Sequence, residues 1–128
     1  MYKRQLNRVG VIITDSKTTP LRWGTTGIAL AYSGFQPLRD YIGQNDLDGR
    51  KMIATKANIA DGLAAAAVLV MGEGREQTPM ATIEDLKFVK FTSIEPSRKK
   101  LKSLKIQIED DLYGELLSSV IWQKGRHR

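Results

Sequence analysis

The chain has 128 residues, no cysteine and a net charge of +6 at pH 7. This length suffices for one domain with its own core, and 41% hydrophobic with 27% charged residues is typical of a globular protein. The lack of cysteine excludes disulfides and thiolate metal sites and fits a reducing cytoplasm. The longest apolar stretch, Leu63 to Met71, is too short to span a bilayer. The basic N-terminus MYKRQLNR lacks an apolar segment, so we do not expect it to be a signal peptide. We expect a single-domain cytoplasmic protein without a membrane partner.

Short apolar runs with many β-branched residues, bounded by Gly, Pro, Asn or Asp, predict strands along the chain. The expected strands are Val9–Thr14, Gly27–Ser33, Lys51–Ala57, Met80–Ile83 and Phe88–Phe91. Leu38–Ile42 is expected to form one helical turn. Glu95–Leu104, opened by Pro96, predicts a surface helix, and the apolar spacing in Glu109–Gln123 predicts a last helix that Gly114 weakens.

The clearest helix is expected at Ile59–Met71. Asn58 is a plausible N-cap, Asp61 lies in the first turn where the helix dipole favours negative charge, and Gly72 suits the C-terminal cap. Four consecutive alanines and the apolar residues that follow leave almost no polar face, which predicts burial on nearly all sides. The predicted fold class is α+β, with a mixed β-sheet packed on this alanine-rich helix.

Asp15 and Ser16 follow the first expected strand directly. A carboxylate at the end of a buried strand is held rigidly and can bind Mg²⁺ or Mn²⁺ with a hydroxyl beside it. The same two residues could instead simply cap a turn. From the local sequence alone both interpretations stay open.

The segment Met71–Gly74 offers a second candidate site, because glycines let a ligand approach the backbone closely. It follows a helix C-terminus, where the dipole repels anions, so it suits a cation or a base edge better than a phosphate. A plain glycine cap is the alternative. In the loop Lys17–Gly27, Arg22 could bind a phosphate or carboxylate, or stack on Trp23. Asp46–Arg50 (DLDGR) predicts a tight turn at Gly49 and lacks the acidic spacing of a calcium loop.

The sequence excludes histidine-dependent nucleophilic catalysis and two common nucleotide-binding motifs. His127 is the single histidine and lies in the tail, which excludes Ser–His–Asp and Cys–His catalysis. The sequence contains neither a P-loop lysine motif nor a G-x-G-x-x-G fingerprint.

The segments VGVIITDSKTTPLRWGTTGIALAYSGFQPLRDYIGQNDLDGR (9–50) and DGLAAAAVLVMGEG (61–74) resemble the C-terminal half of the gamma-glutamyl ligases that add glutamate to the deazaflavin coenzyme, factor 420. The resemblance runs from about Val9 to about Tyr113. Where the deazaflavin ligases usually read Phe-Gly-Arg-Pro, this chain reads Lys17-Thr18-Thr19-Pro20, which matches the folate-type branch of the family better.

The resemblance implies part of a two-domain, intertwined homodimeric ligase. Such an enzyme uses GTP as co-substrate to convert a coenzyme carboxylate into an acyl phosphate, which L-glutamate then attacks. The implied cofactor is Mg²⁺ or Mn²⁺, and the acceptor is a deazaflavin, a folate or another carboxylate-bearing coenzyme. The family's N-terminal half has no counterpart here, so the chain alone is expected to be inactive.

The resemblance also implies the site residues. Asp15, Ser16 and Glu73 would contribute to the divalent-metal site. The guanine-nucleotide site would be lined by Leu69, Val70, Met71, Gly72, Glu73, Gly74, Arg75 and Glu76. Arg22 is a candidate substrate or phosphate contact.

Two alternatives belong to other classes of protein. One is a non-catalytic nucleotide-binding or assembly module that acts with a separate subunit. The other is a basic nucleic-acid-binding domain, which would use the cluster Arg98, Lys99, Lys100, Lys102 and Lys105 as phosphate contacts. We rank the nucleic-acid interpretation last and expect these residues to form a solvated surface, because aromatic residues are not interleaved with them.

Overall fold

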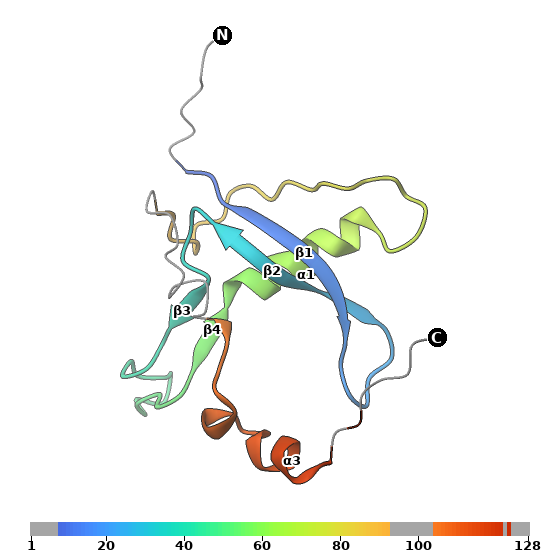
Figure 1. Ribbon diagram of the computed structural model, residues 1–128. Helices are drawn as coiled ribbons and strands as arrows, with labels where there is room; N and C mark the ends of the chain where they lie inside the picture. Colours follow the sequence, from blue (N-terminus) through green and yellow to red (C-terminus); the bar gives the residue numbers. More distant parts are fainter. Residues whose placement is uncertain (1–7, 93–103, 122, 124–128) are drawn as a thin grey trace.

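The computed structural model describes residues 8–92, 104–121 and 123 (Figure 1). Its first element is an antiparallel hairpin of β1 (Val11–Thr18) and β2 (Thr25–Ser33), paired from Val11 with Ser33 to Thr18 with Thr25. β1 is longer than expected because Asp15 to Thr18 continue the pairing with β2, so Asp15 lies within the strand and not at its end. The expected second strand is confirmed.

A β-bulge interrupts this hairpin between Ile13 and Thr14. Ile13 pairs with Ala31 and Thr14 with Ala29, so Leu30 of β2 has no opposing residue. Beyond the bulge, the side chains of β1 alternate between the two faces of the ribbon. Ser16 is half-buried and Asp15 is exposed.

Helix α1 (Ile59–Met71) has the expected bounds. The Asn58 side chain accepts a hydrogen bond from the Asp61 N–H, which confirms the N-cap. The helix ends where Gly72 adopts φ +81°, a backbone conformation that favours glycine.

Helix α1 crosses one face of the β1–β2 ribbon (Figure 1). The approach is close: a Cβ at Gly27 would lie 2.4 Å from the Ala64 carbonyl oxygen. The residues of α1 buried by this packing are Ala60, Ala64 and Val68. Leu69 and Val70 remain 85% and 74% exposed, so the expectation of burial on nearly all sides is wrong. The described elements cover only one face of the helix.

A second hairpin begins with β3 (Leu38–Asp40) and closes with β4 (Lys56–Asn58), which are antiparallel. The expected helical turn at Leu38–Ile42 is therefore wrong, because Leu38 to Asp40 pair with β4. Of the expected strand Lys51–Ala57, only the last two residues belong to β4, and Lys51 forms an isolated bridge with Asn45. The hairpin ends in a tight turn with Gly49 at φ +78°, as predicted.

The core lies where α1, the end of β2 and the segment after α1 meet. Its buried residues are Tyr32, Phe35, Ala60 and Val89, and the rings of Tyr32 and Phe35 are 5.7 Å apart. The expected strands Met80–Ile83 and Phe88–Phe91 are wrong. Met80–Ile83 has no strand pairing, and Phe91 forms a single bridge with Phe35.

The expected last helix Glu109–Gln123 is also wrong as one element. A 3₁₀ turn, η2 (Ile108–Asp110), precedes a short helix α3 (Gly114–Ser119). Gly114, the first residue of α3, packs closely against η2, since a Cβ there would lie 2.0 Å from the Ile108 carbonyl oxygen. The expected helix Glu95–Leu104 lies outside the described residues except for Leu104.

The α+β class is confirmed, with one correction. Where the sequence predicted a mixed sheet, the described strands form two separate two-stranded antiparallel sheets. Within the described part of the chain, no helix has the length and apolarity that crossing a membrane requires.

Candidate functional site

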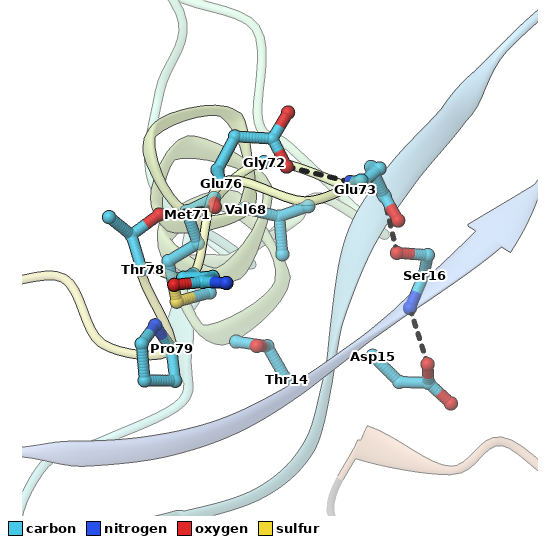
Figure 2. Close-up of a pocket in the computed structure, with 12 residues that line it drawn as sticks. Thr14, Asp15, Ser16, Val68, Met71, Gly72, Glu73, Glu76, Thr78 and Pro79 are labelled. Carbon is cyan, nitrogen blue, oxygen red and sulfur yellow. Dashed lines mark hydrogen bonds between the residues drawn. The ribbon is translucent and has the colours of Figure 1, made fainter.

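A hollow of about 530 Å³ lies between β1 and the C-terminal end of α1 (Figure 2). Three parts of the chain line it: the middle of β1, the last turn of α1 and the loop that follows. The lining residues are Thr14, Asp15, Ser16, Val68, Met71, Gly72, Glu73, Gly74, Glu76, Gln77, Thr78 and Pro79. Segments that are far apart in sequence therefore meet at one place.

Glu73 joins the two sides of this hollow. Its Oε1 accepts a hydrogen bond of 2.5 Å from the Ser16 hydroxyl and one of 3.1 Å from the Thr25 hydroxyl. In Figure 2 the Glu73 carboxylate and the Ser16 hydroxyl face each other across the gap between the loop and β1. The structure thus brings together Ser16 and Glu73, two of the three predicted metal ligands.

Asp15, the third predicted ligand, lies differently. Its Oδ1 accepts the Ser16 backbone N–H at 2.8 Å. Its carboxylate lies on the other side of β1 from Glu73 (Figure 2), as expected for neighbouring strand residues. Within residues 8–92, 104–121 and 123, no three His, Cys, Asp or Glu side chains form a group that could hold a metal ion. The oxygen donors that do meet are one carboxylate and two hydroxyls.

The loop after α1 is folded back on the helix end. The Gly72 N–H donates to the Val68 carbonyl at 2.9 Å, and the Thr78 hydroxyl donates to the Met71 carbonyl at 2.5 Å. The Glu76 carboxylate accepts the Gly74 N–H at 2.8 Å. These bonds fix the backbone next to Glu73 without using the Glu73 side chain.

The charge around this loop favours a cation. The carbonyl end of a helix carries a partial negative charge, and the last turn of α1 contains no basic residue to offset it. Glu73 and Glu76 add two carboxylates at the same end, and Arg75 between them offsets one of these charges. A bound cation would relieve this repulsion, whereas a phosphate would increase it.

The predicted nucleotide segment divides into two groups. The members that line the hollow are Met71, Gly72, Glu73, Gly74 and Glu76. Leu69 and Val70 are exposed on the outer surface of α1, and Arg75 is exposed outside the hollow lining. Met71 at the end of α1 and the loop after it thus border the hollow, whereas Leu69, Val70 and Arg75 do not.

Arg22 is not brought to this hollow. It lies in the tip of the β1–β2 hairpin, where its backbone N–H donates to the Thr19 carbonyl at 3.3 Å. Trp23 beside it is fully exposed, so the alternative interpretation, in which Arg22 stacks on Trp23, is not supported. Of the basic cluster at 98–105, only Lys105 is within the described residues.

Sequence reasoning missed Thr25 and Thr78. Thr25 lies two residues before Gly27 on β2 and therefore on the same face, toward α1. This spacing of two residues from Gly27 could have indicated that Thr25 faces α1. The Thr78 hydroxyl donates to the carbonyl of Met71, seven positions earlier, and no periodic pattern in the sequence indicates this contact.

These features define an α+β protein with a hollow at a helix C-terminus, where one carboxylate and two hydroxyls meet. The family model described as F420-0:Gamma-glutamyl ligase matches residues 1–85, a segment that contains both sides of the hollow. The chain belongs to this family, as the resemblance predicted.

Three curated relatives of the chain carry the name coenzyme F420:L-glutamate ligase. The protein of Haloarcula marismortui is 46% identical over 78 residues, which cover 61% of this chain and 30% of the relative. The protein of Methanococcus maripaludis is 44% identical over 95 residues, covering 73% and 38%. The protein of Archaeoglobus fulgidus is 43% identical over 79 residues, covering 62% and 32%. The chain thus spans about a third of the length of the curated relatives it matches.

Proposed function

We propose that this chain supplies part of the active site of a ligase that adds L-glutamate through an amide bond to a carboxylate of a coenzyme of the F420 type. The observation that carries the proposal is the contact between Ser16 and Glu73, inside the segment that matches the family. The two residues are 57 positions apart in sequence, and their contact creates a polar centre in the hollow. The relatives' shared name supplies the reaction class.

The proposed reaction has two steps, phosphorylation of the acceptor carboxylate and attack by the amine of L-glutamate. A carboxylate oxygen of the acceptor attacks the γ-phosphorus of GTP, and GDP leaves with the electron pair of the broken P–O bond. The amine nitrogen of L-glutamate then attacks the acyl carbon. Phosphate leaves with the C–O electron pair, and the nitrogen loses its proton to solvent. The loop Gly72–Glu76 would contact the nucleotide, and its rigid backbone would orient it.

Mg²⁺ or Mn²⁺ fits the donor set of the hollow. Both ions prefer oxygen ligands, and Mg²⁺ usually takes one or two protein carboxylates together with water and phosphate. Glu73 and the hydroxyl of Ser16 would hold the ion, which would neutralise phosphate charge when bound. Asp15 is the third proposed ligand, and its carboxylate would have to turn around the edge of β1 to join them.

The proposal also covers the oligomeric state and the glutamate acceptor. A homodimer would cover the exposed apolar face of α1 at Leu69 and Val70. The acceptor remains a choice between a deazaflavin and a folate-type coenzyme. The loop Lys17–Pro20 favours the folate type, whereas the names of the relatives favour the deazaflavin.

Calorimetric titration of the 128-residue chain with Mn²⁺, followed by GTP, tests this proposal. We expect saturable Mn²⁺ binding and tighter GTP binding once Mn²⁺ is present. Glu73→Gln should weaken Mn²⁺ binding by about tenfold or more, because it removes the carboxylate that already faces two hydroxyls. Asp15→Asn should weaken it less.

The matched control is Asp48→Asn. Asp48 is an exposed acid in the turn of the second hairpin, so this change removes the same charge away from the hollow. It should leave Mn²⁺ binding unchanged. A folded chain that binds neither Mn²⁺ nor GTP, or one in which all three variants weaken Mn²⁺ equally, would contradict the proposed site.

A further inference from the structure

Asp61 lies outside the hollow, yet it links the helix to the sheet that forms one wall. Its Oδ1 accepts the backbone N–H of Ala29 in β2 at 2.9 Å, and its Oδ2 accepts the Asn58 side-chain amide at 2.7 Å. Both carboxylate oxygens are therefore engaged. Hydrogen bonds to a charged acceptor are stronger than those between neutral groups.

Ala29 is the residue of β2 next to the bulge. It opposes Thr14, and Leu30 beside it is the extra residue. A bulge sets the register of all pairs beyond it, and a shift of one residue turns side chains to the opposite face. The pairs beyond this bulge include Ser16 with Gly27, so the position of the bulge decides which face Ser16 presents.

Helix α1 can pack on β2 only when β1 and β2 pair in the observed register. Gly27 faces α1 so closely that an added Cβ would lie 2.4 Å from the Ala64 carbonyl oxygen. A shift of β2 by one residue would bring Thr26 or Ile28 to that place. Their side chains would push α1 from the ribbon and carry Glu73, just beyond the helix, away from Ser16.

We propose that Asp61 is a positioning residue: by holding the Ala29 N–H it fixes the bulge, and the bulge places Ser16 opposite Glu73. The importance of that placement for ligation rests on the proposed function, but the placement itself does not. Asp61 would act through Ala29 and touch no substrate.

Amide hydrogen exchange and cross-strand nuclear Overhauser contacts in the 128-residue chain test the proposal. In the unmodified chain we expect the Ala29 amide to be protected and Ser16 to contact Gly27. Asp61→Ala should accelerate Ala29 exchange by about tenfold or more, the effect of losing a bond to a charged acceptor, and should abolish the Ser16–Gly27 contact.

Asn58→Ala is the matched control. It removes the N-cap bond to the Asp61 N–H but leaves the Ala29–Asp61 bond in place, whereas Asp61→Ala does the reverse. Both variants lose the bond between the two side chains and should lower global stability. Only Asp61→Ala should change the register, which separates positioning from helix capping.

Asp61→Asn is the rescue variant, because its amide oxygen can still accept the Ala29 N–H. It should keep Ala29 protected and Ser16 beside Gly27, and it decides the question together with Asn58→Ala if Asp61→Ala does not fold. The proposal is overturned if Ala29 exchanges freely in the unmodified chain. It also fails if Asp61→Ala keeps the register, if Asn58→Ala loses it, or if Asp61→Asn does not rescue it.

The outcomes separate this proposal from the proposed function. Loss of register in Asp61→Ala, with no Mn²⁺ binding by the unmodified chain, would support the positioning role and contradict the ligase site. If the unmodified chain binds Mn²⁺ as expected and Asp61→Ala keeps the register, the ligase site is supported and the positioning role is contradicted.

Discussion

Gly27 and Gly62 differ in what an added methyl group would meet. At Gly27 a Cβ would lie 2.4 Å from the Ala64 carbonyl oxygen and 2.8 Å from Val68 Cγ2, whereas at Gly62 nothing lies within 4 Å. Gly27→Ala should therefore destabilise the chain by about 2 kcal/mol, because α1 must move away from β2. Gly62→Ala should stabilise it by roughly 0.5–1 kcal/mol through helix propensity. Urea unfolding of both variants checks the opposite signs, and equal shifts would show that α1 does not pack closely on β2.

The candidate site could be predicted only in part at the level of single residues. The resemblance to the family identified Ser16 and Glu73, and the structure brings them together. The sequence could not tell which face of β1 each residue occupies. The apolar run ends at Thr14, whereas the strand continues to Thr18 because β2 offers partners that lie far along the chain. Asp15 was therefore expected at a strand end and lies instead on the opposite face from Ser16.

Among the elements, α1 was predictable and β3 was not. The signals for α1 are local: an N-cap, an acidic first turn and a stop at glycine, all adjacent to the residues they control. The strand Leu38–Asp40 owes its conformation to pairing with Lys56–Asn58, and its own sequence also allows a helical turn. Pairing between distant segments leaves no periodic signal in a run of three residues.

The turn of the second hairpin yields a prediction for one element. Asp46 Oδ1 accepts the N–H groups of Asp48 and Arg50 at 2.9 and 2.8 Å, while Gly49 donates to the Asp46 carbonyl at 3.1 Å. Asp46→Ala should release the turn, because it removes the acceptor for two backbone amides. Exchange at Asp48 and Arg50 should become about fivefold to tenfold faster, with global stability changed by less than about 1 kcal/mol.

Asp48→Ala is the control for this turn. It removes an exposed acid of the same size and charge, two residues away, and leaves both bonds to Asp46 intact. Exchange at Arg50 should then be unchanged. Equal acceleration in the two variants would mean that charge, not the side-chain acceptor, holds the turn.

At the scale of the whole molecule, the described residues leave much apolar surface uncovered. The fully or largely exposed apolar side chains include Leu21, Trp23, Leu47, Ile53, Leu69, Val70, Met80 and Leu112. A two-stranded ribbon is marginal alone, and here one helix covers only one of its faces. Large exposed apolar patches mark contact with another polypeptide, and Leu69 and Val70 are exposed neighbours on α1. The sequence predicted that α1 is apolar all round, but it could not show which face the rest of the chain covers.

The exposed face of α1 leads to a prediction about association. We expect the 128-residue chain to self-associate with rising concentration in sedimentation velocity, because Leu69 and Val70 are apolar and exposed on one helix. The double change Leu69→Lys with Val70→Lys should shift the population toward monomer, since burying two charges opposes the contact.

The double change Leu47→Lys with Ile53→Lys adds the same charge on the second hairpin, where both residues are also exposed. It should leave association unchanged if the helix is the contact surface. A chain that stays monomeric at every concentration, or an equal response to both double changes, would show that the face of α1 is not where this protein meets a second copy.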